Sequence, residues 1–154
     1  MNLDHVAALA HELMAAHGLL PQWRFAFDHA KRRAGACRHH DSTISVSRHL
    51  MELYSEELVR ETLLHEIAHA LAGPEHNHDA VWRRTARAIG SNGAARIPAA
   101  APQPPAPWIG RCPRGHEYSR HRRPRGGATC SRCSTRYDPR FPIEWSRREV
   151  TSAR

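Results

Sequence analysis

The sequence predicts an α+β fold, in which a domain of helices and a small sheet is followed by a smaller β module. Two patterns predict the domain: apolar residues recur every three or four positions in long runs, as in helices, and alternate with polar residues in short runs, as in strands. A third pattern predicts the module, because an Ala/Pro-rich stretch separates those runs from a short end rich in cysteine and arginine. We therefore expect a domain over residues 1–93, a linker over 94–107, a module over 108–150 and a polar tail over 151–154.

The first helix and the sheet follow from these periods. Helical spacing runs from residue 3 to about residue 16, where a glycine and then a proline end the helix. Alternation predicts strands over 23–28 and 43–47, and the segment 34–38 between them is a candidate partner of the second strand in a hairpin. The expected sheet is small and antiparallel or mixed.

The two remaining helices have start and stop signals. Ser55 is a good N-cap, acidic residues follow it in the first turn, and helical spacing continues to the stop signal Gly73-Pro74. Another helix is expected to begin near Asn77, also a good capping residue, and to end at Gly90.

The formal net charge of +8 lies entirely beyond the Ala/Pro-rich stretch. Residues 1–107 contain eleven Lys/Arg and eleven Asp/Glu, whereas residues 108–154 contain twelve Arg and four acids. Such a basic excess on a small module is typical of a polyanion binder, usually of nucleic acid. The alternative is an arginine-rich surface kept for solubility.

The composition disfavours a membrane protein and a secreted disulfide scaffold. The first residues lack the basic segment of a secretion signal, and no apolar run approaches the roughly eighteen residues of a membrane span. Four cysteines in such a chain favour a reducing compartment, where paired cysteines are metal ligands before they are disulfides. We expect a soluble cytoplasmic protein, associated with the nucleoid if its source is a bacterium or a phage.

The motif His65-Glu66-Ile67-Ala68-His69 lies inside the helix expected after Ser55. Residues four apart stack on one face of a helix, so the two imidazoles can hold one metal ion. Glu66 lies one step round the helix and can act as general base on a water bound to that metal, which is the arrangement of a zinc peptidase. The expected cofactor of this site is one catalytic Zn²⁺.

A catalytic zinc usually has three protein ligands, so a third is expected. Metzincin spacing would place a histidine at position 75, where the chain has Glu75 directly after the helix stop. His76 and His78 remain. We favour His78, because in the first turn of the next helix it is in register with Trp82 on the core-facing side. Cys37 is expected to be a half-buried strand residue, or else a weak or regulatory ligand.

The predicted module contains a second set of metal-binding residues. Cys112 and His116 form a C-x3-H element, and Cys130 and Cys133 form a C-x2-C element. Three thiolates and an imidazole at this spacing suit a closed, tetrahedral structural Zn²⁺, which would supply folding energy that so short a module lacks. His121 is an alternative to His116.

An arginine cluster lies between the two halves of this set and comprises Arg120, Arg122, Arg123 and Arg125. Guanidinium groups bind phosphate oxygens bidentately, and the aromatic residues nearby either stack on unpaired bases or form the small core of the module. We expect DNA binding that tolerates many sequences and weakens steeply with salt.

Three runs of the sequence resemble the SprT-like metalloprotease domain, the family that includes Spartan. They are Ala-Gly-Ala-Cys at 34–37, Ile-Ser-Val-Ser-Arg-His-Leu at 44–50 and Glu-Thr-Leu-Leu-His-Glu-Ile-Ala-His-Ala at 61–70, within a resemblance that covers about residues 20–92. It implies a small zincin-type fold, a histidine triad on zinc, and cleavage of proteins bound or crosslinked to DNA. It also implies that the third histidine precedes an aromatic residue by four positions, as His78 precedes Trp82.

Members of this family often carry a C-terminal zinc ribbon, although a fourth cysteine is common where this chain has a histidine. The chain also departs from the family at Asp79-Ala80-Val81, where many relatives carry Gly-Pro-Glu.

Three functions fit these observations. The first is a zinc endopeptidase that cleaves proteins on DNA. The second is a DNA-binding zinc-ribbon protein with an inactive protease-like scaffold, which the intact residues His65, Glu66, His69 and His78 argue against. The third is a metallopeptidase that cleaves a transcriptional repressor. No feature of the sequence implies an oligomer.

Overall fold

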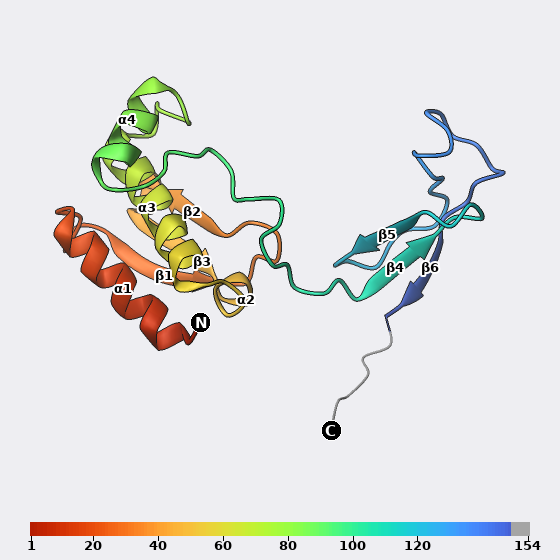
Figure 1. Ribbon diagram of the computed structural model, residues 1–154, viewed down its shortest axis with the longest axis horizontal. Helices are drawn as coiled ribbons and strands as arrows, with labels where there is room; N and C mark the ends of the chain where they lie inside the picture. The colour runs from red at the N-terminus through yellow and green to blue at the C-terminus, as the bar shows by residue number, and fades with distance from the viewer. Residues whose placement is uncertain (149–154) are drawn as a thin grey trace. The chain divides into compact units, whose positions relative to one another are not determined.

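The computed structural model describes residues 1–148, so the predicted polar tail and the last two residues of the predicted module lie outside the described residues. The chain divides into two compact units, Met1–Pro104 and a second unit that begins at Pro105 (Figure 1). The predicted α+β class is confirmed. Residues 94–104, most of the predicted linker, group with the first unit, and Ala101 is buried in its core with 9% exposure.

The sheet of the first unit has the strand order β1-β3-β2. Strand β1 (Arg24–Asp28) runs parallel to β3 (Thr43–Ser47), whereas β2 (Gly35–Arg38) is antiparallel to β3. The predicted hairpin is therefore confirmed, and the sheet is mixed. A short 3₁₀ turn, His39–Asp41, joins β2 to β3. Because β3 is the central strand it is buried along its whole length, while β2 lies at an edge.

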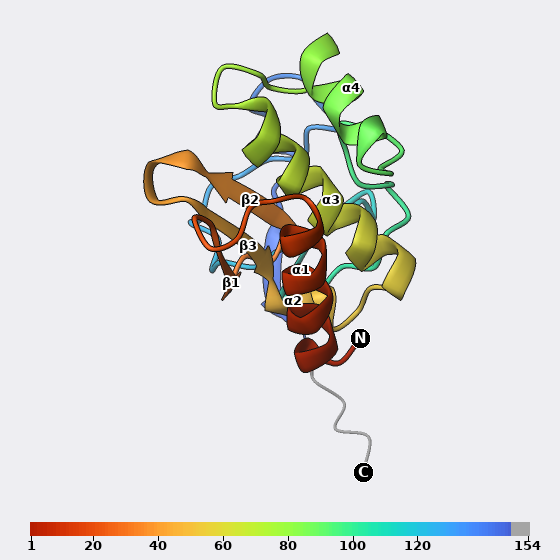
Figure 2. The same ribbon diagram turned by 90° about the vertical axis from the view of Figure 1, so that its left-hand side faces the viewer.

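Helices α1 (Leu3–Ala16) and α3 (Glu56–Ala72) pack against each other and against the sheet (Figure 2). Their apolar stripes and the inward side chains of β3 form the main core, which removes apolar surface from water and is the chief source of stability. The central residues of this core are Val6, Leu9, Leu13, Ile44, Val46, Val59, Leu63 and Ile67.

The ends of α3 have the predicted signals. The Ser55 hydroxyl accepts a hydrogen bond from the Leu58 N–H at 3.3 Å, two glutamates lie in the first turn, and Gly73 follows with a φ of 97°. The structure adds a single helical turn, α2 (Arg48–Met51), which the sequence did not predict because one turn contains no repeat of the helical period.

The last helix of the first unit, α4 (Ala80–Ala88), begins later than predicted. Its N-cap is Asp79, whose carboxylate accepts from the Trp82 N–H at 2.9 Å, and not Asn77. His78 has a φ of 56° and therefore lies outside the helix. The prediction that His78 occupies the first helical turn is wrong, because this left-handed residue ends the loop that precedes the cap.

The second unit contains an antiparallel sheet of order β5-β4-β6, formed by β4 (Trp108–Arg111), β5 (Glu117–Arg120) and β6 (Glu144–Arg147). Gly110 in the central strand allows the close approach of Trp145, because an added Cβ would lie 2.8 Å from the indole ring. Among residues 1–148, no helix has both the length and the apolar character that crossing a bilayer requires.

Candidate active site

Three imidazoles meet beside the C-terminal half of α3, and we call His65, His69 and His78 the histidine triad. His78 Nε2 lies 3.0 Å from His65 Nε2 and 3.0 Å from His69 Nε2. The helix places the first two residues on one face, and the loop after Gly73 returns the chain so that His78 faces them. His76 is not part of the triad, because its Nδ1 lies 2.8 Å from the Asp79 carboxylate.

The triad has the donor set of a zinc site. Zinc–nitrogen bonds of about 2.0–2.1 Å at tetrahedral angles place two ligand nitrogens about 3.3 Å apart, close to the spacing of these rings. The His65 ring also donates to the carbonyl of Ala94, and the His69 ring to the carbonyl of His76. These bonds use Nδ1, because Nε2 of each ring faces His78, and they leave the Nε2 lone pairs for a metal ion.

Burial keeps the triad neutral. Desolvation, followed by the neighbouring imidazoles, lowers the pKa of His65 and of His69 to about 4. Desolvation and then Arg83 lower the pKa of His78 as well. Neutral imidazole is the form that binds metal, so all three residues are ready to bind at neutral pH.

Trp82 packs against the whole triad. Its side chain is fully buried, and its ring centroid lies 4.7 Å from that of His65, 5.1 Å from that of His69 and 4.6 Å from that of His78. The indole therefore restricts the rotamers of all three rings from one side.

Glu66 projects from α3 toward strand β2. It is 7% exposed, and this burial raises the pKa of its carboxyl group to about 8, against the charge of Arg33 and the Cys37 N–H, which both favour the ionised form. Gly35 makes this position possible, since a Cβ there would lie 2.5 Å from Glu66 Oε1. The carboxylate is thus fixed between a helix and a strand edge.

Two cavities of about 550 Å³ and 420 Å³ meet at this carboxylate, and both are lined by Arg33, Gly35, His65 and Glu66. The larger one is bounded on one side by residues 94–99 and Gln103. We call residues 94–103 the wall segment. The sequence predicts a linker there, whereas the structure places most of these residues along the cavity next to the triad.

Cys37 lines the smaller cavity, and its Sγ lies 3.6 Å from His39 Nε2. Burial, followed by the charge of Glu66, raises the pKa of this thiol to about 12. The thiolate is the form of cysteine that binds metal, so the environment of Cys37 opposes the role of ligand. The structure places it in β2, partly buried.

With this geometry in place, the comparisons with known proteins decide the family. The model of the SprT-like family matches residues 5–102. The chain belongs to the SprT-like family. This match includes most of the wall segment, and it confirms the resemblance seen in the sequence.

Two solved structures match part of this SprT-like chain. The metallopeptidase zymogen jannalysin of Methanocaldococcus jannaschii is 17% identical, with a TM-score of 0.49 over 56% of this chain and 83% of that one. The metallopeptidase zymogen abylysin of Pyrococcus abyssi is 20% identical, with a TM-score of 0.46 over 53% of this chain and 76% of that one. No curated protein matches the chain.

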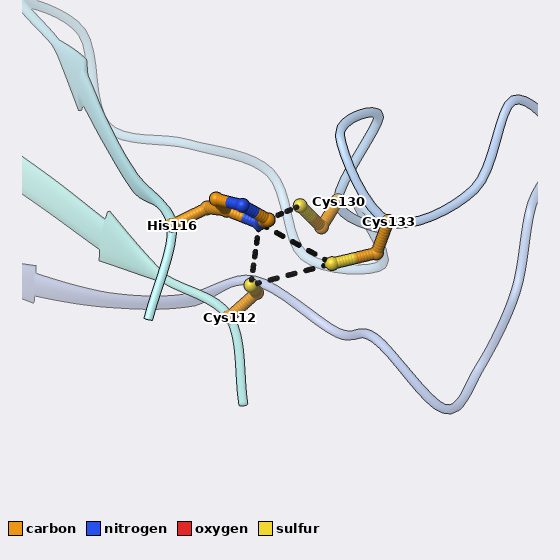
Figure 3. A group of neighbouring side chains, drawn as sticks. All are labelled: Cys112, His116, Cys130 and Cys133. Carbon is orange, nitrogen blue, oxygen red and sulfur yellow. Dashed lines mark hydrogen bonds between the residues drawn. The ribbon is translucent and has the colours of Figure 1, made fainter. Parts of the chain in front are cut away.

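The second unit of the SprT-like chain brings Cys112, His116, Cys130 and Cys133 together (Figure 3). We call them the cysteine–histidine cluster. His116 Nδ1 lies 3.6, 3.4 and 3.3 Å from the three sulfur atoms in chain order, and the Sγ atoms of Cys112 and Cys133 are 3.8 Å apart. His121, the alternative ligand, is not part of the cluster.

These distances fit tetrahedral zinc. Zinc–sulfur bonds of about 2.3 Å and zinc–nitrogen bonds of about 2.0–2.1 Å separate two sulfur atoms by about 3.8 Å and a sulfur from a nitrogen by about 3.5 Å. Burial opposes ionisation of Cys130, but hydrogen bonds from Tyr118 and Cys133 lower the pKa of its thiol to about 6. The Tyr118 hydroxyl lies 3.0 Å from this sulfur.

The arginine cluster is exposed. Arg120 Cζ lies 5.6 Å from the ring centroid of Trp145, and Arg123 Cζ lies 5.9 Å from that of Trp108. Trp108 pairs with Arg120 on one side and with Arg147 on the other, and paired residues of antiparallel strands share a face of the sheet. Arg122 and Arg125 lie in the loop after β5.

Sequence reasoning missed the groups that hold the site in place. The carbonyls of Ala94 and His76 belong to the backbone, so no residue type marks them. Gly35 lies inside one of the runs that resemble the family, but its role depends on its contact with Glu66 on a distant helix. The one signal in the sequence is the glycine at position 35, because a glycine in a strand often marks a place where another segment approaches the backbone closely.

The lowered pKa values of the triad predict zinc binding that resists acid. Protonated imidazole does not bind metal, and a pKa near 4 moves proton competition well below the pH of about 6.5 at which free histidine begins to compete. The dissociation constant of triad zinc, measured by chelator competition, is expected to stay nearly constant from pH 8 to pH 5.5 and to rise below that. His65→Ala identifies which ion is being measured, and a tenfold weakening between pH 7 and 6 contradicts the prediction.

The Gly35 contact predicts a destabilising substitution. Gly35→Ala forces Glu66 or strand β2 to move, and overpacking of this kind lowers the free energy of unfolding by about 1–3 kcal/mol. Urea denaturation measures the change. Gly126→Ala is the control, because a Cβ at that position meets no atom within 4 Å. Equal stability of the two variants would show that Glu66 is not confined by β2.

Proposed function

We propose that the protein is a zinc-dependent endopeptidase, with His65, His69 and His78 as ligands and Glu66 as general base. The observation that carries this proposal is the meeting of three neutral imidazole nitrogens beside a buried carboxyl group that lines two cavities. Membership of the SprT-like family supports it.

The proposed reaction assigns a separate role to the histidine triad, to Glu66 and to the groups that contact Glu66. A zinc ion bound at the triad would lower the pKa of its water toward neutrality and stabilise the negative charge that develops on the peptide carbonyl. Glu66 is placed to accept a proton from the attacking water and would return it to the leaving amine. The Cys37 N–H and Arg33 favour the carboxylate form of Glu66, which is the form that a base requires.

The shape of the site supports a peptide substrate. The two cavities extend from Glu66 in different directions, so an extended chain has room for residues on both sides of the bond that is cut. Strand β2 is an edge strand beside the same carboxylate, and edge strands pair with extended peptides through backbone hydrogen bonds. Cleavage within a chain therefore fits better than removal of a terminal residue.

We propose further that the second unit is a zinc ribbon that binds DNA, so that the substrates are proteins bound or crosslinked to DNA. The exposed arginines, with Trp108 and Trp145 on the same small sheet, offer phosphate contacts and stacking faces together. Arg120, Arg122, Arg123 and Arg125 form no ion pair with a carboxylate of residues 1–148, whereas Arg111 pairs with Glu117. The four guanidinium groups are thus available to an external anion.

An inactive scaffold explains the site less well. Burial raises the pKa of Glu66 to about 8 even though Arg33 and the Cys37 N–H favour the ionised form, so an acidic group here costs stability that an inactive scaffold has no need to bear. A repressor-cleaving peptidase remains the second candidate, and it differs from the first in the effect of DNA on cleavage.

Glu66→Gln tests the catalytic role. The amide has nearly the same shape but cannot accept a proton, so cleavage of a denatured protein substrate is expected to fall by about 10²–10⁴-fold while zinc content stays at the wild-type value. Zinc per chain is measured by atomic emission, and cleavage by gel electrophoresis with a chelator control. A Glu66→Gln protein that cleaves as fast as wild type rejects the assignment of the base.

The arginine cluster predicts the salt dependence of DNA binding. Replacing Arg120, Arg122, Arg123 and Arg125 by alanine is expected to weaken binding to single-stranded and duplex DNA, and to reduce the slope of log K against log salt by about 0.7–0.9 for each phosphate that is no longer neutralised. Fluorescence anisotropy at several salt concentrations measures the slope. Arg111→Ala is the matched control, because Arg111 is already paired with Glu117 at 2.5 Å.

The same variants separate the candidate functions. Digestion of a DNA-binding protein with and without DNA is expected to be faster with DNA for wild type and not for the fourfold arginine variant. Cleavage that is independent of DNA favours the repressor-cleaving peptidase, and no metal-dependent cleavage at all favours the inactive scaffold.

A further inference from the structure

Glu61 lies on α3 one helical turn before His65, and its carboxylate is bonded to a loop that follows α4. Oε1 accepts from the Ser91 hydroxyl at 2.5 Å and from the Asn92 N–H at 3.2 Å, and Oε2 lies 3.3 Å from the same N–H. Glu61 thereby ties the helix of the triad to residues thirty positions later in the chain.

The loop held by Glu61 has three further hydrogen bonds of its own. The Ser91 N–H donates to the Ala86 carbonyl at 3.0 Å, and the Ser91 hydroxyl accepts from the Gly93 N–H at 3.1 Å. Asn92 Oδ1 accepts from the Ala94 N–H at 2.7 Å. Ser91 is 6% exposed, so the hydrogen bonds of its hydroxyl group compete little with water, whereas those of Asn92 lie at the surface.

The loop ends at the carbonyl that orients a triad residue. Ala94 accepts a hydrogen bond from the His65 ring, whose Nε2 faces the other imidazoles. A continuous series of hydrogen bonds therefore runs from the Glu61 carboxylate through the loop to the Ala94 carbonyl and the His65 ring. Ala94 and His65 also line the same cavity, together with Glu61 and Asn92.

We propose that Glu61 is a positioning residue for the metal site, which acts on His65 through residues 91–94. This inference rests on the proposed zinc site. A hydrogen bond to the second nitrogen of a ligand histidine fixes its tautomer and orientation, and losing such a partner typically costs about 10–100-fold in metal affinity. Without Glu61, the loop loses its attachment to α3, and the Ala94 carbonyl loses its fixed place beside the ring.

The loop also leads directly into the wall segment. Ala94 and the residues that follow it bound the larger cavity, so the bonds made by Glu61 position both a metal ligand and one side of the substrate cleft. Loss of Glu61 is therefore expected to weaken zinc binding and to raise KM, with a smaller effect on kcat when zinc is saturating.

The experiment measures zinc affinity in the full chain for Glu61→Ala, Glu61→Gln, Ser91→Ala and Glu57→Ala. Glu57 is the matched control, because it is an exposed glutamate one turn earlier on the same helix. The cysteine–histidine cluster serves as an internal reference, since it lies in the other unit. Chelator competition gives the dissociation constant of each ion, and the visible spectrum of the cobalt-substituted triad reports its geometry.

We expect Glu61→Ala to weaken triad zinc by about 10–100-fold and to alter the cobalt spectrum, with the cluster zinc unchanged. Glu61→Gln keeps an oxygen that can accept from the loop and is expected to restore part of the affinity. Ser91→Ala, a smaller change that leaves the helix intact, is expected to weaken triad zinc in the same direction.

Two outcomes overturn the inference. If Glu61→Ala and Ser91→Ala both bind triad zinc as tightly as Glu57→Ala, Glu61 does not position His65 and the zinc site itself still stands. If wild type binds zinc only at the cysteine–histidine cluster, the proposed function fails and this inference fails with it. The two failures are distinguished by the wild-type measurement alone.

Discussion

The meeting of three imidazole nitrogens beside a buried carboxylate is the constraint on which the first unit depends. Helix α3 supplies two nitrogens through its own period, but the third must arrive from outside the helix. Gly73 ends the helix and His78 takes a left-handed conformation, so that the chain reverses within a few residues. Asp79 then caps α4, which places Trp82 against all three rings. Each of these features follows from local chain geometry, and together they place the His78 ring beside those of His65 and His69.

Helix α3 makes different contacts on each of its faces. Leu63 and Ile67 bury one face in the core, His65 and His69 lie on the side that faces His78, and Glu61 holds the loop after α4. The neighbouring strand β2 approaches closely enough to confine Glu66 because position 35 has no side chain. The helix therefore cannot shift along its axis without breaking contacts on several sides, and such constraint is what the proposed role of Glu66 as a base requires.

Features of the fold and the site could be predicted from the sequence where a single residue type or a single spacing pattern determines them. The bounds of α1 and α3 and the pairing of β2 with β3 follow from spacing and caps, and the spacing of Cys112, His116, Cys130 and Cys133 suggested a group that the structure also brings together. His78 was chosen for a helical register that it does not have, because a left-handed turn has no periodic signature. The wall segment was assigned to a linker because Ala and Pro cannot build a core; they can still cover one, as Ala101 does. Backbone acceptors such as the Ala94 carbonyl cannot be read from residue types at all.

Removal from water acts on the histidines and on Glu66 alike. It shifts their pKa values in opposite directions, but in each case it favours the neutral form. It lowers the pKa of His65 and His69 to about 4 and raises that of Glu66 to about 8, so in the protein alone every one of these groups is neutral at neutral pH. A dication bound by the imidazoles would favour the ionised carboxylate, because opposite charges attract strongly where water is scarce. In the proposed enzyme, Glu66 would thus become an anion when the histidine triad holds a metal ion. Burial against β2 therefore makes Glu66 a better proton acceptor than an exposed carboxylate, and this is the property that the proposed mechanism requires of it.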